Sequence, residues 1–483
     1  MQDIDIATIK EKAVKGIIAL TGRTFFLQII AFSATFLLTI FLSPAVFGVF
    51  YVVSACISFL SYFSDIGLAA ALIQKKETLT DEDLRTTFTI QQGLVLSLCL
   101  IMLLLSGNIG SFYKLDSSGV WLFRSLVLSF FLSSLKTIPS VLLERKLEFK
   151  KLVFPQIIET IGFYGVSVVL AWQGFGIASF SYAVLVRAIV GLFILYTIAP
   201  WKISIGLSFP VARKLLRFGI PFQMNSILAL AKDDLMTIFL GRILSFTEIG
   251  YIGWAKKWAE VPLRLIMDSV IRVTFPTFSR LQHDKEVLGK AIEKTLFGLA
   301  VTIIPISIGL LFFIEPAVSL IPKYGKWYPA LLSFYLFVIT SLVAAFSTPL
   351  TNALNAVGKI KITLFLMVFW TIATWVLTLT CIPLVGFNGV ALAQTILSLS
   401  VFIVVALVKK VSPFSFIQST RIPVFAACVQ SAVYYLLRGS RPYDFLSLSV
   451  VSALGVILYI GIVWFLEKKR ILSVFALLRR NTI

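Results

Sequence analysis

Long apolar segments recur along the whole chain, separated by short polar segments that are rich in lysine and arginine. Each apolar segment holds about 20 residues, the length at which an α-helix crosses a hydrocarbon core of about 30 Å. The pattern predicts fourteen membrane-spanning helices. Their approximate bounds are residues 17–42, 46–73, 86–105, 120–143, 152–172, 177–198, 215–242, 249–278, 291–314, 327–355, 362–382, 389–408, 422–437 and 445–466.

Basic residues alternate between loops that are rich in them and loops that are poor in them. Clusters at residues 145–151, 409–410 and 468–470 fall on one side of the predicted membrane. The opposite loops hold only Lys114, Lys323, Lys326, Arg438 and Arg441. Because loops rich in lysine and arginine stay in the cytoplasm, both termini are predicted to be cytoplasmic.

The amino-acid composition also indicates a protein that is surrounded by lipid. The 483 residues are 58% hydrophobic and 14% charged, with a formal net charge of +20, and the mean hydropathy is +0.96. This composition excludes an ordinary soluble domain and predicts an all-α integral membrane protein. The basic excess follows from the topology and from attraction to anionic headgroups, so no nucleic-acid partner is predicted.

Faint internal similarity relates the two halves of the chain. The segment LSPAVFGVF at residues 42–50 resembles LSFTEIGYI at residues 244–252, and Gly174–Ala178 resembles the segment at residues 386–391. Pro139 and Pro349 fit a similar offset. A six-span repeat predicts two parallel lobes related by a pseudo-two-fold axis along the membrane normal, with a binding site between them near the midplane. The predicted divisions are a lobe at residues 1–204, a lobe at 205–412, and two additional helices with a basic cytoplasmic tail at 413–483.

Formal charges lie inside the seventh and eighth predicted spans. A charge near the middle of a bilayer costs at least about 2.5 to 3.5 kcal/mol, so such residues face water, a partner or cargo. Lys257, Glu260, Arg264, Asp268 and Arg272 advance by three or four residues, so they form one helical stripe in which opposite charges alternate. The stripe either neutralises itself toward the protein interior or lines a polar path.

The embedded charges are more basic than acidic, which favours an anionic cargo such as a phosphate or diphosphate headgroup. The candidate substrate-binding residues are Arg23, Lys136, Arg187, Asn225, Lys232, Lys256, Lys257, Arg264 and Arg272. Six carboxylates are candidates for coupling to a proton or sodium gradient, or for pairing with a nearby base: Asp65, Glu159, Asp233, Asp234, Glu260 and Asp268. No Walker A sequence is present, and no cofactor, metal site or catalytic residue is predicted.

Several sequence features occur together over essentially the whole chain. They are the fourteen-span plan, the early Arg23, the element at residues 42–50, the FSDIGL end of the second span at 63–68, and the element from Pro139 to Lys151. In combination they resemble the Wzx-type polysaccharide flippases of the multidrug/oligosaccharidyl-lipid/polysaccharide exporter superfamily.

That resemblance implies an inverted V of two six-helix lobes around a cationic central cavity. It implies alternating access that carries undecaprenyl-diphosphate-linked oligosaccharide units from the inner to the outer leaflet of a bacterial inner membrane. It also implies polysaccharide polymerases or co-polymerases as partners. By resemblance to lipid II flippases, which carry arginines in spans one and eight, Arg23 and Arg264 are counterparts of those arginines.

Two other functions are open at this point. A drug or cation antiporter of the same superfamily predicts an acidic and aromatic pocket, which the basic excess disfavours. A membrane glycan polymerase or ligase handles the same lipid-linked sugars but generally presents a large catalytic outer loop. The longest outer loops predicted here, residues 106–119 and 315–326, are short, and the sole histidine, His283, falls in a predicted cytoplasmic loop. A transporter is therefore favoured over an enzyme.

Overall fold

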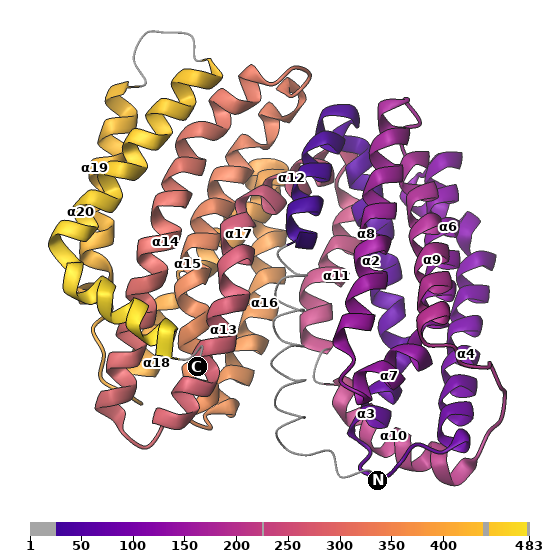
Figure 1. The fold of residues 1–483 in the computed structure, drawn as a ribbon. Coiled ribbons are helices and arrows are strands. Elements are labelled where there is room, and N and C mark those ends of the chain that lie inside the picture. The colour runs from indigo at the N-terminus through magenta and orange to yellow at the C-terminus, as the bar shows by residue number, and fades with distance from the viewer. Residues whose placement is uncertain (1–25, 225–226, 438–443, 481–483) are drawn as a thin grey trace. The chain divides into compact units, whose positions relative to one another are not determined.

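The computed structural model describes residues 26–224, 227–437 and 444–480, and every regular element within those ranges is helical. The chain divides into two compact units, Met1–Gly250 and Tyr251–Ile483. Figure 1 shows the helices of each unit running roughly alongside one another. The predicted all-α fold class is confirmed for the described residues.

An apolar helix at Phe26–Phe41 opens the described part of the first unit. The helices that follow are α2 (Pro44–Asp65), α3 (Leu68–Gln74), α4 (Asp81–Leu104), α5 (Ser106–Tyr113), α6 (Ser117–Ser134), α7 (Thr137–Arg145), α8 (Phe149–Trp172), α9 (Ala178–Ile198), α10 (Phe209–Met224) and α11 (Ile227–Ile243). Helix α12 (Phe246–Ala259) begins in this unit and continues into the second. Helix α9 packs on α6 and α8, and α2 packs on α11, α6 and α4.

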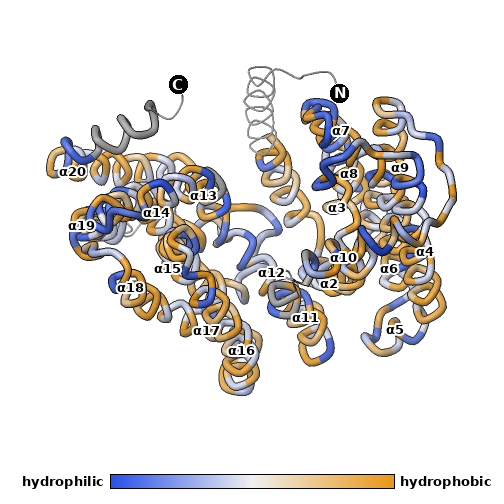
Figure 2. The backbone as a smooth tube through the Cα atoms, turned by 90° about the horizontal axis from the view of Figure 1, so that it is seen from below, coloured by the Kyte–Doolittle hydropathy of each residue, from blue (hydrophilic) through white to orange (hydrophobic). Residues whose placement is uncertain are grey.

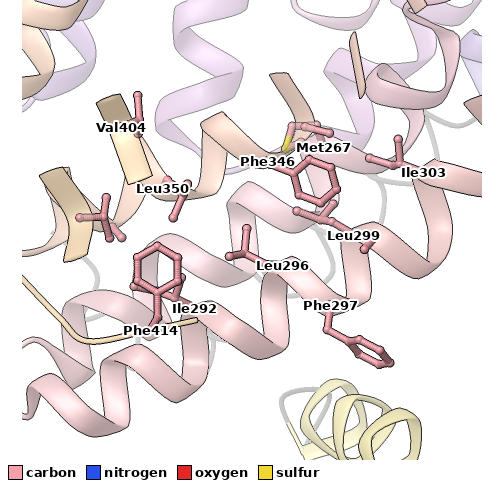
Figure 3. Close-up of a cluster of buried hydrophobic side chains, with 14 of the residues drawn as sticks. Met267, Ile292, Leu296, Phe297, Leu299, Ile303, Phe346, Leu350, Val404 and Phe414 are labelled. Atoms are coloured by element: carbon pink, nitrogen blue, oxygen red, sulfur yellow. The ribbon is translucent and has the colours of Figure 1, made fainter. Parts of the chain in front are cut away.

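The second unit continues with α13 (Val261–Leu281), α14 (Lys285–Leu320), η1 (Gly325–Ala330), α15 (Leu331–Ala356), α16 (Ile360–Val385), η2 (Gly386–Asn388), α17 (Gly389–Ser398), α18 (Val401–Lys409), α19 (Phe416–Leu437) and α20 (Phe445–Arg480). Helix α14 packs on α15, α19 and α20, and α13 packs on α15. Figure 3 shows Met267, Leu299 and Phe346 of the buried apolar cluster directed toward one another. These contacts join α13, α14 and α15 into one core.

Nine helices in the described residues are long and apolar enough to cross a membrane, or ten when α6 and α7 count as one bent span. Three features explain the difference from the fourteen predicted spans. The opening helix Phe26–Phe41 is apolar, but within the described residues it is too short to count. The stretch Ile360–Lys409 counts as one candidate, although it contains α16, α17 and α18, where the sequence predicts two spans. Helices α10 to α13, which carry the embedded charges, are not among the nine.

The apolar faces of these helices are exposed on the protein. Helix α16 leaves Leu364, Phe365, Ile372, Val376 and Leu384 exposed, and Figure 2 shows it hydrophobic along most of its length. Apolar surface of this extent is unfavourable in water and is suited to contact with lipid chains.

The two similar segments at residues 42–50 and 244–252 lie against each other at the starts of α2 and α12. A Cβ atom on Gly48 would collide with the backbone of Phe246, and a Cβ atom on Gly250 would collide with the backbone of Pro44. Gly48 and Gly250 occupy the same position in the two segments, as do Pro44 and Phe246. The contact is therefore reciprocal within the first unit, and glycine at both positions allows the backbones to approach closely.

Candidate functional site

A bend between α6 and α7 places a lysine inside the first unit. The two helices meet at 41°, within the single span that the sequence predicts at 120–143. Pro139 has no N–H to donate to the carbonyl of Leu135 four residues earlier, and the hydroxyl of Tyr196 donates to that carbonyl instead, at 3.0 Å. Lys136 lies at the bend as the N-cap of α7.

The Lys136 side chain forms an ion pair with Glu159 of α8. Its Nζ lies 2.7 Å from Glu159 Oε1, and the two side chains are 16% and 10% exposed. Glu159 rests on α9 at Gly191, where a Cβ atom would collide with the carboxylate. The glycine therefore provides the space in which the carboxylate meets the lysine.

Arg187 of α9 is the second cation near Glu159. Its Nε lies 3.9 Å from Glu159 Oε2 and its side chain is 54% exposed. The guanidinium also lies over the ring of Phe163, 6.0 Å from the ring centroid, at the outer limit of a cation–π contact. Glu159 is thus shared by two cations from different helices, one held tightly and one loosely.

These three residues line a cavity of about 850 Å³ within the first unit. The volume lies in the upper part of the range of about 300 to 1,000 Å³ that is usual for small-molecule sites. Its lining residues are Phe50, Ser54, Ala69, Ile73, Gln91, Leu126, Ser129, Ser133, Lys136, Thr137, Ser140, Val141, Glu144, Glu159, Phe163, Tyr164, Val184 and Arg187. Two basic residues balance two acidic ones, and the remainder combines hydroxyl groups with aromatic and aliphatic surface.

Two lining residues carry a buried polar atom without a hydrogen-bond partner in the described structure, Ser54 Oγ and Gln91 Oε1. Gln91 is 4% exposed, and its amide Nε2 donates to Thr137 Oγ1 at 2.9 Å. Leaving a buried polar atom unsatisfied costs about 1 to 3 kcal/mol. Unsatisfied groups beside a cavity indicate a site that a polar ligand or water completes.

Three further predicted residues lie on α11. Lys232 and Asp234 are partly buried and Asp233 is exposed. Asp234 Oδ2 accepts a hydrogen bond from Ser58 Oγ of α2 at 3.0 Å. None of these three residues lines the cavity just described.

The predicted charge stripe of the second unit is partly paired. Glu260 Oε2 lies 2.7 Å from Arg264 Nη2, and Glu260 Oε1 lies 4.0 Å from Lys256 Nζ. Glu260 separates α12 from α13. Lys257 is partly buried, and Arg264 and Arg272 are exposed. The pairing follows the four-residue spacing in the sequence.

Four predicted residues cannot be placed in this way. Arg23 and Asn225 lie outside the described residues, and the side chains of Asp65 and Asp268 lie outside what the structure describes. Their roles stay predictions.

The uncharged lining of the cavity is not among the residues predicted from the sequence. Ser129, Ser133 and Ser140, with Thr137, fall on one face of α6 and α7 at helical spacing, a signal that was available in the sequence. Gln91 and Ser54 carry no such signal, because Gln91 donates to Thr137 of another helix and Ser54 Oγ has no partner in the described structure. Gly191 is likewise recognisable only once α8 and α9 are packed together.

The fold and its charged interior define a multi-pass, all-helical integral membrane protein. The sequence profile of a family described as "Polysaccharide biosynthesis protein" matches residues 37–331, which is more than half of the chain. The chain belongs to this Wzx-like family of polysaccharide biosynthesis proteins.

Curated relatives agree with this assignment. The succinoglycan biosynthesis transport protein ExoT of Rhizobium meliloti (strain 1021) is 27% identical over 278 residues, which cover 57% of this chain and 56% of that protein. The lipopolysaccharide biosynthesis protein WzxC of Escherichia coli (strain K12) is 26% identical over 328 residues, which cover 67% of this chain and 66% of that protein. The matched region thus spans a little over half to two thirds of these relatives.

Solved structures share the fold. The lipid II flippase MurJ in an inward closed conformation aligns with a TM-score of 0.75 and 17% identity, covering 95% of this chain and 100% of that one. An inward-facing multidrug resistance MATE family transporter of the MOP superfamily aligns with a TM-score of 0.61 and 15% identity, covering 81% of this chain and 98% of that one. At these identities the likeness concerns the fold alone.

Proposed function

We propose that the chain is a flippase for lipid-linked oligosaccharides. It moves undecaprenyl-diphosphate-linked repeat units from the inner to the outer leaflet of a bacterial inner membrane, for the synthesis of an exopolysaccharide, a capsule or an O-antigen. Its fourteen spans form two six-helix lobes, at residues 1–204 and 205–412, followed by two helices and a cytoplasmic tail at 413–483. The observation that carries the proposal is the ion-paired, hydroxyl-lined cavity among helices that belong in a membrane.

Support comes from the family and from the chemistry of the interior. One relative is named as a transport protein of succinoglycan biosynthesis, and another as a lipopolysaccharide biosynthesis protein. Charges in a membrane domain are costly and mark a path for polar cargo. A transporter explains both observations without a catalytic step.

The mechanism that we propose is alternating access. Basic residues bind the anionic head by charge-assisted contacts, drawn from Arg23, Lys136, Arg187, Lys232, Lys256, Lys257, Arg264 and Arg272, with Asn225 as a polar contact. Sugars occupy the wet interior while the lipid chain stays in the bilayer. Rocking of one lobe against the other then exposes the head on the opposite side.

The driving force that we propose is an inward proton or sodium gradient. Carboxylates among Asp65, Glu159, Asp233, Asp234, Glu260 and Asp268 would titrate or bind the ion during the cycle. Polysaccharide polymerases or co-polymerases receive the translocated unit.

Deletion of the gene in its host tests the proposal. The lipid-linked repeat unit is expected to accumulate, unpolymerised and facing the cytoplasm, and wild-type protein is expected to clear it. A polymerase or ligase would instead leave single units on the outer face. An antiporter would leave the lipid-linked pool unchanged and alter drug resistance.

A further inference from the structure

We propose that the cavity of the first unit is a subsite for the glycan part of the cargo, a neutral or weakly acidic oligosaccharide, and not for the diphosphate. The inference rests on the proposed function and assigns a narrower task to this one cavity. Among the candidate cations, Lys136 and Arg187 are then assigned to the glycan, and the diphosphate is bound by those that lie elsewhere in the chain.

The charge of the lining argues against a diphosphate in this cavity. Lys136 and Arg187 are opposed by Glu144 and Glu159, and Glu159 already pairs with Lys136 at 2.7 Å. A diphosphate carries several negative charges, and its repulsion by both carboxylates offsets its attraction to the two cations. A sugar with many hydroxyl groups carries no net charge, so it suits a lining whose positive and negative charges are equal in number.

The uncharged lining matches the two surfaces of a sugar ring. Hydroxyl groups from Ser129, Ser133, Ser140 and Thr137 lie on one wall formed by α6 and α7. Ser129 and Thr137 already donate to the carbonyls of Val184 and Ser134 at 3.1 and 2.9 Å, so their oxygens serve as acceptors. A hydroxyl both donates and accepts hydrogen bonds, so Ser133 and Ser140 can do both toward the vicinal hydroxyls of a glycan. The ring of Phe163 and its neighbour Phe50 offer apolar surface to the C–H face of a pyranose.

The unsatisfied groups give a second, independent indication. Gln91 is buried, with only 4% of its surface exposed. Its Oε1 accepts no hydrogen bond within the described structure. Ser54 Oγ is likewise unsatisfied. An acceptor amide and a hydroxyl both suit the hydroxyl donors of a sugar, whereas an acceptor oxygen would oppose a phosphate.

The ion pair also fits this role. Polar pairs such as Lys136 and Glu159 present a donor and an acceptor side by side, the arrangement that two adjacent sugar hydroxyls require. Arg187 is half exposed and only 3.9 Å from the same carboxylate, so it can swing toward the ligand while Lys136 keeps Glu159 in place.

The test measures binding to the full chain in lipid nanodiscs by calorimetry. One probe is phosphate-free glycan of repeat-unit size, obtained by partial hydrolysis of the host's exported polysaccharide, and the other is inorganic pyrophosphate. Ser133→Phe and Ser140→Phe fill the cavity from α6 and α7. Ser97→Phe adds the same ring at an exposed position of α4 that does not line the cavity.

We expect the Kd for glycan to rise about tenfold or more in both filling variants and to stay unchanged in Ser97→Phe. Gln91→Met removes the unsatisfied acceptor without adding a ring, and weakens glycan binding about fivefold. Pyrophosphate binding is expected to stay within twofold of wild type in all variants.

Three results would overturn the inference. They are glycan binding that none of the variants changes, loss of pyrophosphate binding in the filling variants with glycan binding intact, and no saturable glycan binding to wild-type protein. Failure of the proposed function gives a different result. In that case the protein binds glycan as predicted, but cells that lack the gene accumulate no lipid-linked unit.

Discussion

Gly48 of α2 lies directly against the backbone of Phe246 at the start of α12, so close that no Cβ atom fits between them. Its counterpart in the second similar segment, Gly250, makes the reciprocal contact with Pro44. Two segments that are 202 positions apart in the sequence thus cross each other through their equivalent glycines. The crossing joins the start of α2 to the start of α12 within the first unit.

Gly48→Ala is expected to destabilise the protein. The added methyl group forces the two backbones apart, at a cost of about 1 to 3 kcal/mol, which lowers the thermal midpoint measured in detergent. Gly93→Ala is the matched control, because a Cβ atom on Gly93 of α4 meets nothing within 4 Å. That control should leave the midpoint unchanged or raise it, since alanine favours the helix. Equal midpoints for the two variants would contradict the close crossing.

The pair of Lys136 and Glu159 is expected to show strong energetic coupling. Lys136→Met or Glu159→Gln alone leaves one charge unpaired in a largely buried place, at a cost of about 3 kcal/mol each. The double variant should lose less than the sum of the single losses, by about 1 kcal/mol or more. Thermal midpoints of the four proteins measure this cycle.

The exposed pair of Lys214 and Glu77, 3.5 Å apart, serves as its control. Lys214→Met should leave the thermal midpoint nearly unchanged, because exposed pairs contribute little. Additive losses at Lys136 and Glu159 would show that the two side chains do not depend on each other.

Ser54 and Ser58 lie one turn apart on α2 and are expected to respond oppositely to alanine. Ser54→Ala removes a buried hydroxyl that has no partner, so stability should hold or rise by about 1 kcal/mol. Ser58→Ala removes the hydrogen bond to Asp234 and should lower stability by about 1 kcal/mol. The glycan affinity of Ser54→Ala should fall even as its midpoint holds, a combination that a purely structural serine would not give.

Arg145 is expected to be a structural residue. Its guanidinium donates to the carbonyls of Leu72, Lys75 and Glu77 at 2.6, 2.6 and 2.9 Å, which holds the loop after α3. Lysine cannot reproduce this planar set of donors, so Arg145→Lys should cost about 2 kcal/mol. Lys146→Ala at the neighbouring, exposed position should be near neutral. A transport defect in Arg145→Lys at full stability would assign this residue to function instead.

The sequence was sufficient to predict the helical fold, because an apolar segment long enough to cross a membrane has few stable structures other than a helix. It was also sufficient for the pairing of Glu260 with Arg264, which depends only on a four-residue spacing within the chain. The bend at Lys136 was predictable only in part, from Pro139. Pro139 removes one local hydrogen bond, but the compensating hydroxyl comes from Tyr196, 57 residues further on.

The cavity was likewise not predictable from the sequence as a single site. Lys136, Glu159 and Arg187 were each singled out by their charge, the cations for substrate and the carboxylate for ion coupling. Their shared position depends on the packing of α8 against α9, and on the space that Gly191 leaves for a carboxylate. Spacing along one helix carries no information on such contacts between helices.

Transport of the lipid-linked unit by purified protein tests the central claim most directly. Proteoliposomes would contain the wild-type chain and the lipid-linked repeat unit that accumulates in deletion cells, and an added glycosidase would report the fraction of units on the outer leaflet. The account predicts that this fraction grows with time in wild-type vesicles, and much more slowly with Ser133→Phe than with Ser97→Phe. A fraction that stays fixed in vesicles of folded wild-type protein, under an imposed proton or sodium gradient as well as without one, would contradict it.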